Sequence, residues 1–275
     1  MEIEKDKINR MDLKQNMMKH ILFKVDYQGV VSIEVLMTKL NEYIQTKFSN
    51  YETKFLNGLE IQVNSIQELS ETLSLPVKEI TKQPLHVFTG NKFGSDQLTL
   101  TISKYFTELN IQCKDYKTID EYLIFFQELF FKLKEFEHFI SEKRFGLRKI
   151  GFGLFNERDE IFDQFEKKIM EPECPGFPIK EGTSVQKLRT EKYDIIFRRQ
   201  IEEGIILEKG EQKKAYKATL DIDGVLTEND LKNNNDWKTI GGMKESLKVL
   251  NDDLFKIYKL SVTKKFLNEC LKQGG

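Results

Sequence analysis

The sequence predicts an α+β fold of two similar halves, each built as strand, helix, antiparallel meander and long helix. Three observations lead to this class. Short segments with apolar residues at every second position recur between turns, which is typical of antiparallel strands. Two long segments, 118–140 and 243–267, instead carry apolar residues at three- and four-residue spacing, which is typical of helices. The 21 phenylalanines in a chain of 275 residues indicate a large aromatic core.

The first half is predicted to start with a strand at His20, because every second residue from Ile21 to Tyr27 is apolar. A helix capped by Ser32 follows. The most regular helix of this half starts at the capping-box pattern of Thr118–Glu121. In order, the expected elements are a strand over 20–27, a helix over 33–48, strands over 59–63, 86–88, 98–102 and 106–111, and a helix over 118–140.

The second half repeats this order of elements. Its first strand is expected over 145–154, where the apolar phase slips between Leu147 and Ile150 and therefore predicts a bulge. A short helix and three strands follow, with breaks predicted at Gly204 and Gly210. The remaining elements are expected as a helix over 161–169, strands over 193–197, 205–207 and 216–222, and a final helix over 243–267.

The likeness of the two halves lies in the order of elements and not in residue-level similarity. We expect a polar N-terminal segment over 1–19, a first α+β half over 20–142 and a second α+β half over 143–275. Two such halves, each wrapping a curved sheet around its long helix, would be related by a pseudo-twofold axis. This arrangement resembles the duplication of the TATA-binding-protein-like fold. Whether the halves form one domain stays open on the sequence alone.

The charge balance argues against a generic nucleic-acid or membrane binder, because 43 basic and 44 acidic residues leave a net charge of −1. No apolar run reaches the roughly 18 residues that a membrane span needs, and the first twenty residues lack the apolar core of a signal peptide. Three widely spaced cysteines fit free thiols in a reducing compartment. The three histidines lack metal-ligand spacing. We therefore expect a cytoplasmic protein with no membrane span and no cofactor.

The segment Leu220–Thr227, LDIDGVLT, resembles the first motif of haloacid-dehalogenase-type phosphatases. The resemblance implies that Asp221 would attack phosphorus and help to hold Mg²⁺, and that Asp223 would act as acid and base. In that family the motif ends the first strand of a parallel sheet, and more than a hundred residues follow it. Here the residues after Thr227 indicate only a polar loop and a helix, so we expect an Asp-Gly turn that closes an antiparallel strand.

A local excess of basic residues is the second candidate site. Between Lys143 and Arg158 there are five basic residues and one acid, Glu157. If the basic residues of a later strand share a face with these, they would bind phosphate, nucleotide or nucleic acid. The alternative is a solvated strand face with intramolecular ion pairs. The residues expected to form the binding surface are Arg144, Arg148, Lys149, Arg189, Arg198 and Arg199.

The stretch Lys143–Gly151, KRFGLRKIG, resembles the R-x-GLR-Y-I-N core of a sporadically distributed family of uncharacterised bacterial proteins, which shares with this chain a GLR-x-I core motif. The early strand at Ile21–Tyr27, the acidic and aromatic helix at Tyr116–Phe139 and the late LDID strand end are similar to the same family. The likeness spans nearly the whole chain. It implies a bacterial source and a patchily inherited gene, a distribution that is common among phage-defence components.

Two positions depart from the family pattern. Lys149 stands where the family tends to have Tyr, and Gly151 stands where it tends to have Asn. Roles of those two side chains therefore do not carry over from the family, whereas Gly146, Leu147 and Arg148 match it.

From these observations we expect a non-enzymatic recognition or accessory protein of a bacterial defence or counterdefence system. It would bind a protein or nucleic-acid partner through the curved sheet or the basic strand face. The alternative is a Mg²⁺-dependent phosphatase or nuclease that uses Asp221 and Asp223. A structural subunit that forms a fixed homo-oligomer is a third class.

Overall fold

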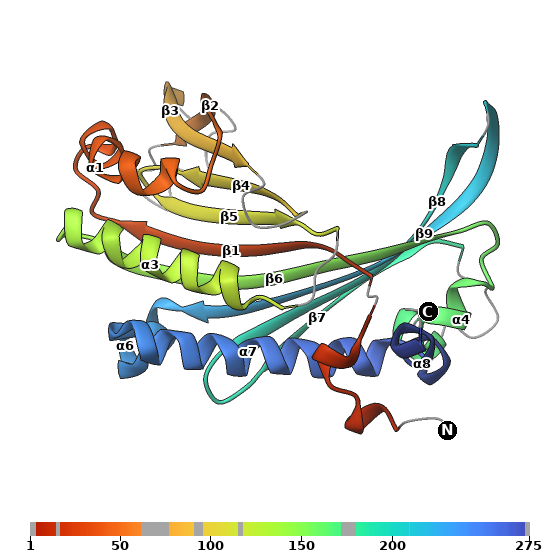
Figure 1. The fold of residues 1–275 in the computed structure, drawn as a ribbon. Coiled ribbons are helices and arrows are strands. Elements are labelled where there is room, and N and C mark those ends of the chain that lie inside the picture. Colours follow the sequence, from red (N-terminus) through yellow and green to blue (C-terminus); the bar gives the residue numbers. More distant parts are fainter. Residues whose placement is uncertain are drawn as a thin grey trace, which may run out of the picture.

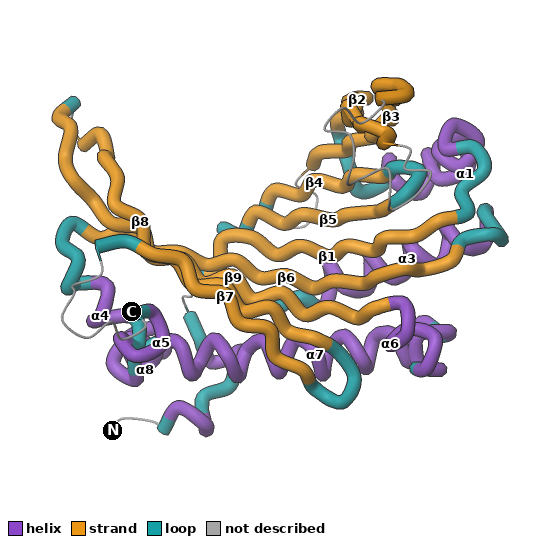
Figure 2. The backbone as a smooth tube through the Cα atoms, turned by 180° about the vertical axis from the view of Figure 1, so that it is seen from behind, coloured by secondary structure: helices purple, strands orange, loops and turns teal. Residues whose placement is uncertain are grey.

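The computed structural model describes residues 4–14, 17–61, 77–90, 96–114, 118–171, 180–208 and 210–272. The fold is α+β, as predicted: across these residues nine strands form one antiparallel sheet, and the long helices lie against one face of it (Figures 1 and 2). Within the described ranges, no helix is long and apolar enough to cross a membrane.

The elements follow the chain in this order, beginning with two 3₁₀ turns. Up to the middle of the chain they are η1 Lys5–Lys7, η2 Arg10–Asp12, β1 Met18–Gln28, α1 Ile33–Gln45, β2 Asn50–Ile61, β3 Val77–Gly90, β4 Gln97–Ile102, β5 Phe106–Gln112 and α3 Asp120–Phe136. From there they are β6 Ser141–Phe155, α4 Ile161–Gln164, α5 Lys167–Met170, β7 Gly182–Arg189, β8 Asp194–Glu208, β9 Glu211–Thr227, α6 Glu228–Asn233, η3 Asn235–Lys238, α7 Ile240–Ser261 and α8 Lys264–Lys272.

The strands are ordered β2-β3-β4-β5-β1-β6-β9-β8-β7 across the sheet. Its centre is the antiparallel pair of β1 and β6, in which Phe23 lies opposite Leu147 and Val25 opposite Phe145. Because β1 belongs to the predicted first half and β6 to the second, the sheet runs without interruption across the expected boundary at residue 143.

One face of the sheet is covered by α3 and α7, and the core lies between these helices and the sheet. Alternate residues of β1, such as Phe23, are fully buried on this face. Phe126 of α3 stacks on Phe23 with ring centroids 5.5 Å apart and meets Phe145 of β6 edge-on at 6.0 Å. Four fully buried residues at helical spacing turn α7 toward the sheet, namely Met243, Leu247, Leu250 and Leu254.

The polar N-terminal segment is part of the fold. Its two short 3₁₀ turns lie beside α7 and α8 (Figure 1). Ile8 and Leu13 are buried there, and the backbone N–H of Lys14 donates to the carbonyl oxygen of Cys270 at 2.9 Å.

The strands of the second half differ from the prediction at Gly204 and at the sheet edge. Gly204 does not break the chain, because β8 pairs with β9 through this residue up to Glu208. The turn falls at Gly210, whose φ of 85° suits glycine. The resulting β8–β9 hairpin projects beyond the body of the sheet (Figures 1 and 2). The edge strand β7 was not predicted, since its GTSVQKLR sequence lacks alternating apolar residues.

The predicted bulge between Leu147 and Ile150 is wrong. β6 alternates regularly through this region, with Lys149 in the covered position and Ile150 on the opposite face. The register shift lies instead in the neighbouring strand β1, between Met18 and His20, opposite Gly151. A side chain at Gly151 would meet Met18, since an added Cβ would lie 2.7 Å from its Cε.

Two predicted helices are interrupted for a common reason. The segment 161–169 forms two single-turn helices, α4 and α5, and the predicted final helix ends at Ser261 and restarts as α8. Phe165 and Val262 lie at these two breaks and form an isolated antiparallel bridge with each other. Each residue therefore adopts an extended conformation that a continuous helix would not allow.

Helix α3 differs from the prediction at both ends. The predicted capping box does not form: Ile119 is the N-cap residue, and the Thr118 hydroxyl accepts a hydrogen bond from the Asp120 N–H at 3.3 Å. At the other end the helix stops at Phe136, so Phe139 lies outside it and is 75% exposed. For the strand predicted over 59–63, β2 accounts for the part up to Ile61, and residues 62 and 63 lie outside the described ranges.

Candidate functional site on the open sheet face

We call the sheet face opposite α3 and α7 the open face, because no helix of the described residues lies on it (Figure 2). Alternation along β6 turns Phe145 and Leu147 toward the helices and Arg144 and Arg148 toward the open face. Cross-strand partners share a face, so Asp223, which lies opposite Arg148, also points there.

The centre of the open face is Asp221, which is 6% exposed and accepts from two arginines. Arg148 donates from Nε to Oδ1 at 2.7 Å and from Nη2 to Oδ2 at 2.6 Å, which is the two-pronged geometry of a strong guanidinium–carboxylate pair. Arg198 of β8, directly opposite Asp221 in the register, adds a contact from Nη1 to Oδ2 at 3.3 Å. Three neighbouring strands are therefore joined by one carboxylate.

A second pair extends the network toward β1. Arg144 donates from Nη2 to Oδ2 of Asp223 at 3.1 Å and lies 3.5 Å, through Nη1, from Oδ2 of Asp26. Arg144 crosses over Gly146 in this diagonal contact, since an added Cβ would lie 3.4 Å from Arg144 Nη2, at ordinary van der Waals distance. Lys24 of β1 in turn lies 3.2 Å from Asp26 Oδ1 and 4.6 Å from the centre of the Phe106 ring.

Burial and these contacts shift the pKa values of three side chains on the open face. The hydrogen bonds that Arg148 donates to Asp221 raise the pKa of Arg148, so this guanidinium stays charged. Burial raises the pKa of Asp223, against the opposing effect of Arg144 and Arg148. Burial likewise raises the pKa of Glu108 on β5, with Lys24 opposing it.

The network has equal numbers of acidic and basic side chains. Its four bases are Lys24, Arg144, Arg148 and Arg198, and its four acids are Asp26, Glu108, Asp221 and Asp223. The geometry of Arg144, Arg148 and Arg198 therefore matches the alternative stated above, a strand face with intramolecular ion pairs.

Two of the six basic residues expected on one surface, Lys149 and Arg199, do not lie on the open face. Lys149 points the other way, is 5% exposed, and burial together with Arg10 lowers the pKa of its ammonium well below the usual value. Arg199 also points toward the covered face, where its Nη2 donates to Ser184 Oγ at 2.6 Å and its Nη1 to the Ile169 carbonyl at 3.0 Å. Burial lowers the pKa of Arg199.

Arg189 lies at the sheet edge, at the end of β7. It bonds Asp230 from Nη2 at 2.6 Å and Asp194 from Nη1 at 3.0 Å. These bonds raise its pKa, the one to Asp230 more than the one to Asp194. Arg189 therefore ties the edge strand to α6 and stands apart from the network around Asp221.

The phosphatase-like motif has a different setting from the one predicted. Asp221 and Asp223 lie inside β9, which continues to Thr227, so the predicted Asp-Gly turn is wrong. Gly224 instead packs closely against α7, because an added Cβ would lie 2.4 Å from Leu250 Cδ1 and would force that side chain to shift. Among the residues that the structure describes, no group of three or more His, Cys, Asp or Glu side chains is placed to hold a metal ion.

Sequence reasoning missed the residues that the first half of the chain contributes to the network. Asp26 and Lys24 occupy the polar positions of a strand that was predicted correctly, and Glu108 occupies the equivalent position of β5. The alternation therefore contained the signal, but pairing β1 with both β5 and β6 was needed to bring these residues together. No family model, curated protein or solved structure matches the chain.

Proposed function

We propose that the chain is a non-enzymatic recognition protein that binds a protein partner on the open face. The observation that carries the proposal is a sheet face without a described helix, on which a network of four basic and four acidic side chains extends across five strands. A surface that binds nucleic acid through phosphates needs an excess of positive charge. The network around Asp221 lacks this excess. A balanced pattern of both signs suits a protein surface with the complementary pattern.

Apolar side chains between the charges support a protein partner. Leu22 lies opposite Arg148 and Ile196 opposite Asp223, so both point to the open face, and Ile150 lies opposite Asp221. All three are partly exposed. Protein interfaces combine apolar contact with paired charges in this way, and arginine is enriched in them. The resemblance to patchily distributed bacterial proteins suggests a defence or counterdefence system as the setting of this interaction.

Site-specific photo-crosslinking tests the proposal. A benzoylphenylalanine placed at Ile150 reports on the open face, and the same residue at Val249, which is 46% exposed on α7, is the matched control on the helical side. In cells that naturally express the chain, we expect a defined protein adduct from Ile150 and none from Val249. Equal adducts from both positions, or none from either, would contradict the proposal.

An exchange variant separates recognition from folding. Arg148→Asp combined with Asp221→Arg keeps an ion pair and the net charge but moves the positive charge to the neighbouring strand. We expect this variant to fold and unfold cooperatively but at a lower temperature than the parent, because the new arginine at position 221 would lie opposite Arg198 and the new aspartate at position 148 opposite Asp223. At a temperature where it is folded, we expect it to lose the Ile150 adduct. A retained adduct would show that the network does not recognise the partner.

Two other outcomes would favour the remaining functions. If nucleic acid co-purifies with the chain and is lost in Arg148→Ala, the partner would be a nucleic acid and not a protein. Hydrolysis of a phosphate ester in Mg²⁺, abolished by Asp221→Asn, would establish the enzymatic alternative.

We also infer that the two halves are a structural duplication. The sheet order supports this, because β1 and β6 each start a meander and pair with its last strand, β5 and β9 respectively. A long helix, α3 or α7, then follows each meander. Superposition of 18–136 on 141–261 tests the inference: the central strand, the meander and the long helix should coincide in one operation close to a twofold rotation.

A further inference from the structure

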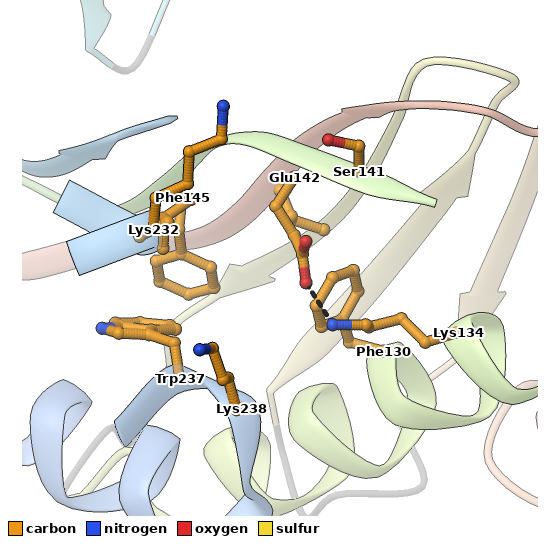
Figure 3. Close-up of a pocket in the computed structure, with 10 residues that line it drawn as sticks. Phe130, Lys134, Ser141, Glu142, Phe145, Lys232, Trp237 and Lys238 are labelled. Atoms are coloured by element: carbon orange, nitrogen blue, oxygen red, sulfur yellow. Dashed lines mark hydrogen bonds and ion pairs between the residues drawn. The ribbon is translucent and has the colours of Figure 1, made fainter. Parts of the chain in front are cut away.

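A cavity of about 190 Å³ lies on the covered side of the sheet, where β6 begins and α3 ends. Its apolar wall is mostly aromatic and is made by Phe130 of α3, Phe145 of β6 and Trp237 of η3, together with the aliphatic side chains of Val25 and Leu231. Figure 3 shows the rings of Phe145 and Trp237 one above the other on one side, with an ion pair between Lys134 and Glu142 on the other.

The segment that carries Trp237 is held firmly in place. The Asn234 side chain accepts from the Asp236 N–H at 3.0 Å at the start of η3. The segment also rests directly on the first turn of α7, since a Cβ added to Gly242 would lie 2.3 Å from the Asp236 carbonyl oxygen. Trp237 is 8% exposed, and its ring lies 4.9 Å from that of Phe145.

The indole N–H of Trp237 is buried and has no acceptor among the residues that the structure describes. Figure 3 draws this nitrogen at the end of the ring that points away from Lys134, Glu142 and Lys238, so a carboxylate held by the lysines would not reach it.

The charged side chains that line the cavity are mostly basic. Three lysines and one glutamate contribute, which gives the lining a net charge of +2; they are Lys134, Lys232, Lys238 and Glu142. Lys134 lies 2.5 Å from Glu142, and Lys232 lies 2.6 Å from Glu228, outside the cavity. In Figure 3 the Lys232 ammonium points away from the rings of Phe145 and Trp237, so an anion beside these rings would meet the ammonium groups of Lys134 and Lys238.

We propose that this cavity binds a small aromatic carboxylate, with its ring against Trp237 and Phe145 and its carboxylate among the lysines. The volume suits a single ring with a short acidic side chain, because a cavity of about 150 Å³ accommodates benzene. Aromatic walls favour an aromatic ligand through offset and edge contacts. The positive lining selects an anion over a neutral molecule or a cation. This site lies on the opposite side of the sheet from the open face, so it does not depend on the function proposed there.

The tryptophan provides the measurement, because Trp237 is the only tryptophan in the chain. The purified full chain is titrated with phenylacetate while the emission of Trp237 is followed. Benzylamine, benzyl alcohol and acetate are titrated in parallel, since each lacks either the negative charge or the ring. We expect a saturable change with phenylacetate and binding weaker by about tenfold or more with the other three. Calorimetry on the same samples checks that the fluorescence reports binding.

Matched variants locate the site. Lys238→Met removes a charge at the cavity and should weaken phenylacetate binding about tenfold, whereas Lys248→Met, on α7 outside the lining, should leave it unchanged. Gly242→Ala should displace η3 and weaken binding, whereas Gly241→Ala, whose added Cβ meets nothing within 4 Å, should not.

Thermal unfolding of each variant shows that it is folded. Equal binding of phenylacetate and benzylamine, or unchanged binding in both Lys238→Met and Gly242→Ala, would overturn the proposal.

Discussion

The two faces of the sheet treat neighbouring residues of one strand in opposite ways. Arg148 points to the open face, where its hydrogen bonds to Asp221 raise its pKa. Lys149 points to the covered face, where burial and the nearby Arg10 lower its pKa well below the usual value. The same basic dipeptide therefore yields a permanently charged group on one side and a group that is easily deprotonated on the other.

The difference shows how the two faces are stabilised. The covered face excludes water and depends on close packing of aromatic and branched side chains. The open face is ordered by paired charges that remain partly solvated, and such pairs contribute little to stability. Substitutions should therefore have large effects on folding on the covered face and smaller ones on the open face.

The largest effect is expected where the covered face is most tightly packed. Phe126→Ala removes a fully buried ring that contacts both Phe23 and Phe145, and should lower the free energy of unfolding by about 3–5 kcal/mol. Phe139→Ala is the control, because this ring is 75% exposed and should change stability by no more than about 0.5 kcal/mol. Urea denaturation measures both, and similar losses in the two variants would contradict the assignment of the core.

An intermediate effect is expected at the centre of the open face. Asp221→Asn leaves Arg148 and Arg198 without their shared carboxylate and should lower the free energy of unfolding by about 1–3 kcal/mol. Arg198→Met should cost less, because its contact of 3.3 Å is longer and Arg148 remains in place. Urea denaturation at low and high salt measures the loss, and a variant as stable as the parent would show that the network contributes nothing to folding.

The smallest effect is expected at Lys149, as a change in how the free energy of unfolding depends on pH. Because the folded pKa of Lys149 is depressed, the unfolded chain binds more protons between that pKa and the unfolded value of about 10.5. The free energy of unfolding should therefore rise with pH across this window and level off below the folded pKa, where Lys149 is protonated in both states. Lys149→Met should show a flatter dependence between pH 7 and about pH 9.5, below the range in which tyrosines ionise. Parallel curves for parent and variant would show that Lys149 is protonated alike in both states.

Much of the fold could be predicted from the sequence, because the alternation of apolar residues depends only on which face is buried. The strand predicted over 20–27 is confirmed as β1, and the helix predicted from residue 118 is confirmed as α3. Long-range pairing could not be predicted. The bridge between Phe165 and Val262 interrupts two helical patterns, and neither pattern identifies the distant residue with which it pairs. Thr263 is a local signal for the second break, since its hydroxyl accepts from the Phe266 N–H at 3.1 Å where α8 begins.

The candidate site could be predicted only in part, for a related reason. The parity of β6 places Arg144 and Arg148 on the face opposite Lys149, and the sequence already contains that parity. The assumed bulge at Leu147 obscured it. The acidic partners of these arginines could not be found without strand order, because Asp26 precedes Arg144 by 118 residues.

The contact between the N-terminal segment and the last two helices has a consequence for synthesis on the ribosome. Lys5 donates to the carbonyl oxygen of Val262, 257 residues later, and Arg10 bonds Asp252. The N-terminal segment leaves the ribosome early, but Ile8 and Leu13 can be buried only after α7 and α8 have been translated. Because this contact closes a long loop late in folding, it should be less stable than the sheet. Shortening α8 should therefore detach the N-terminal segment from the last two helices before the sheet unfolds.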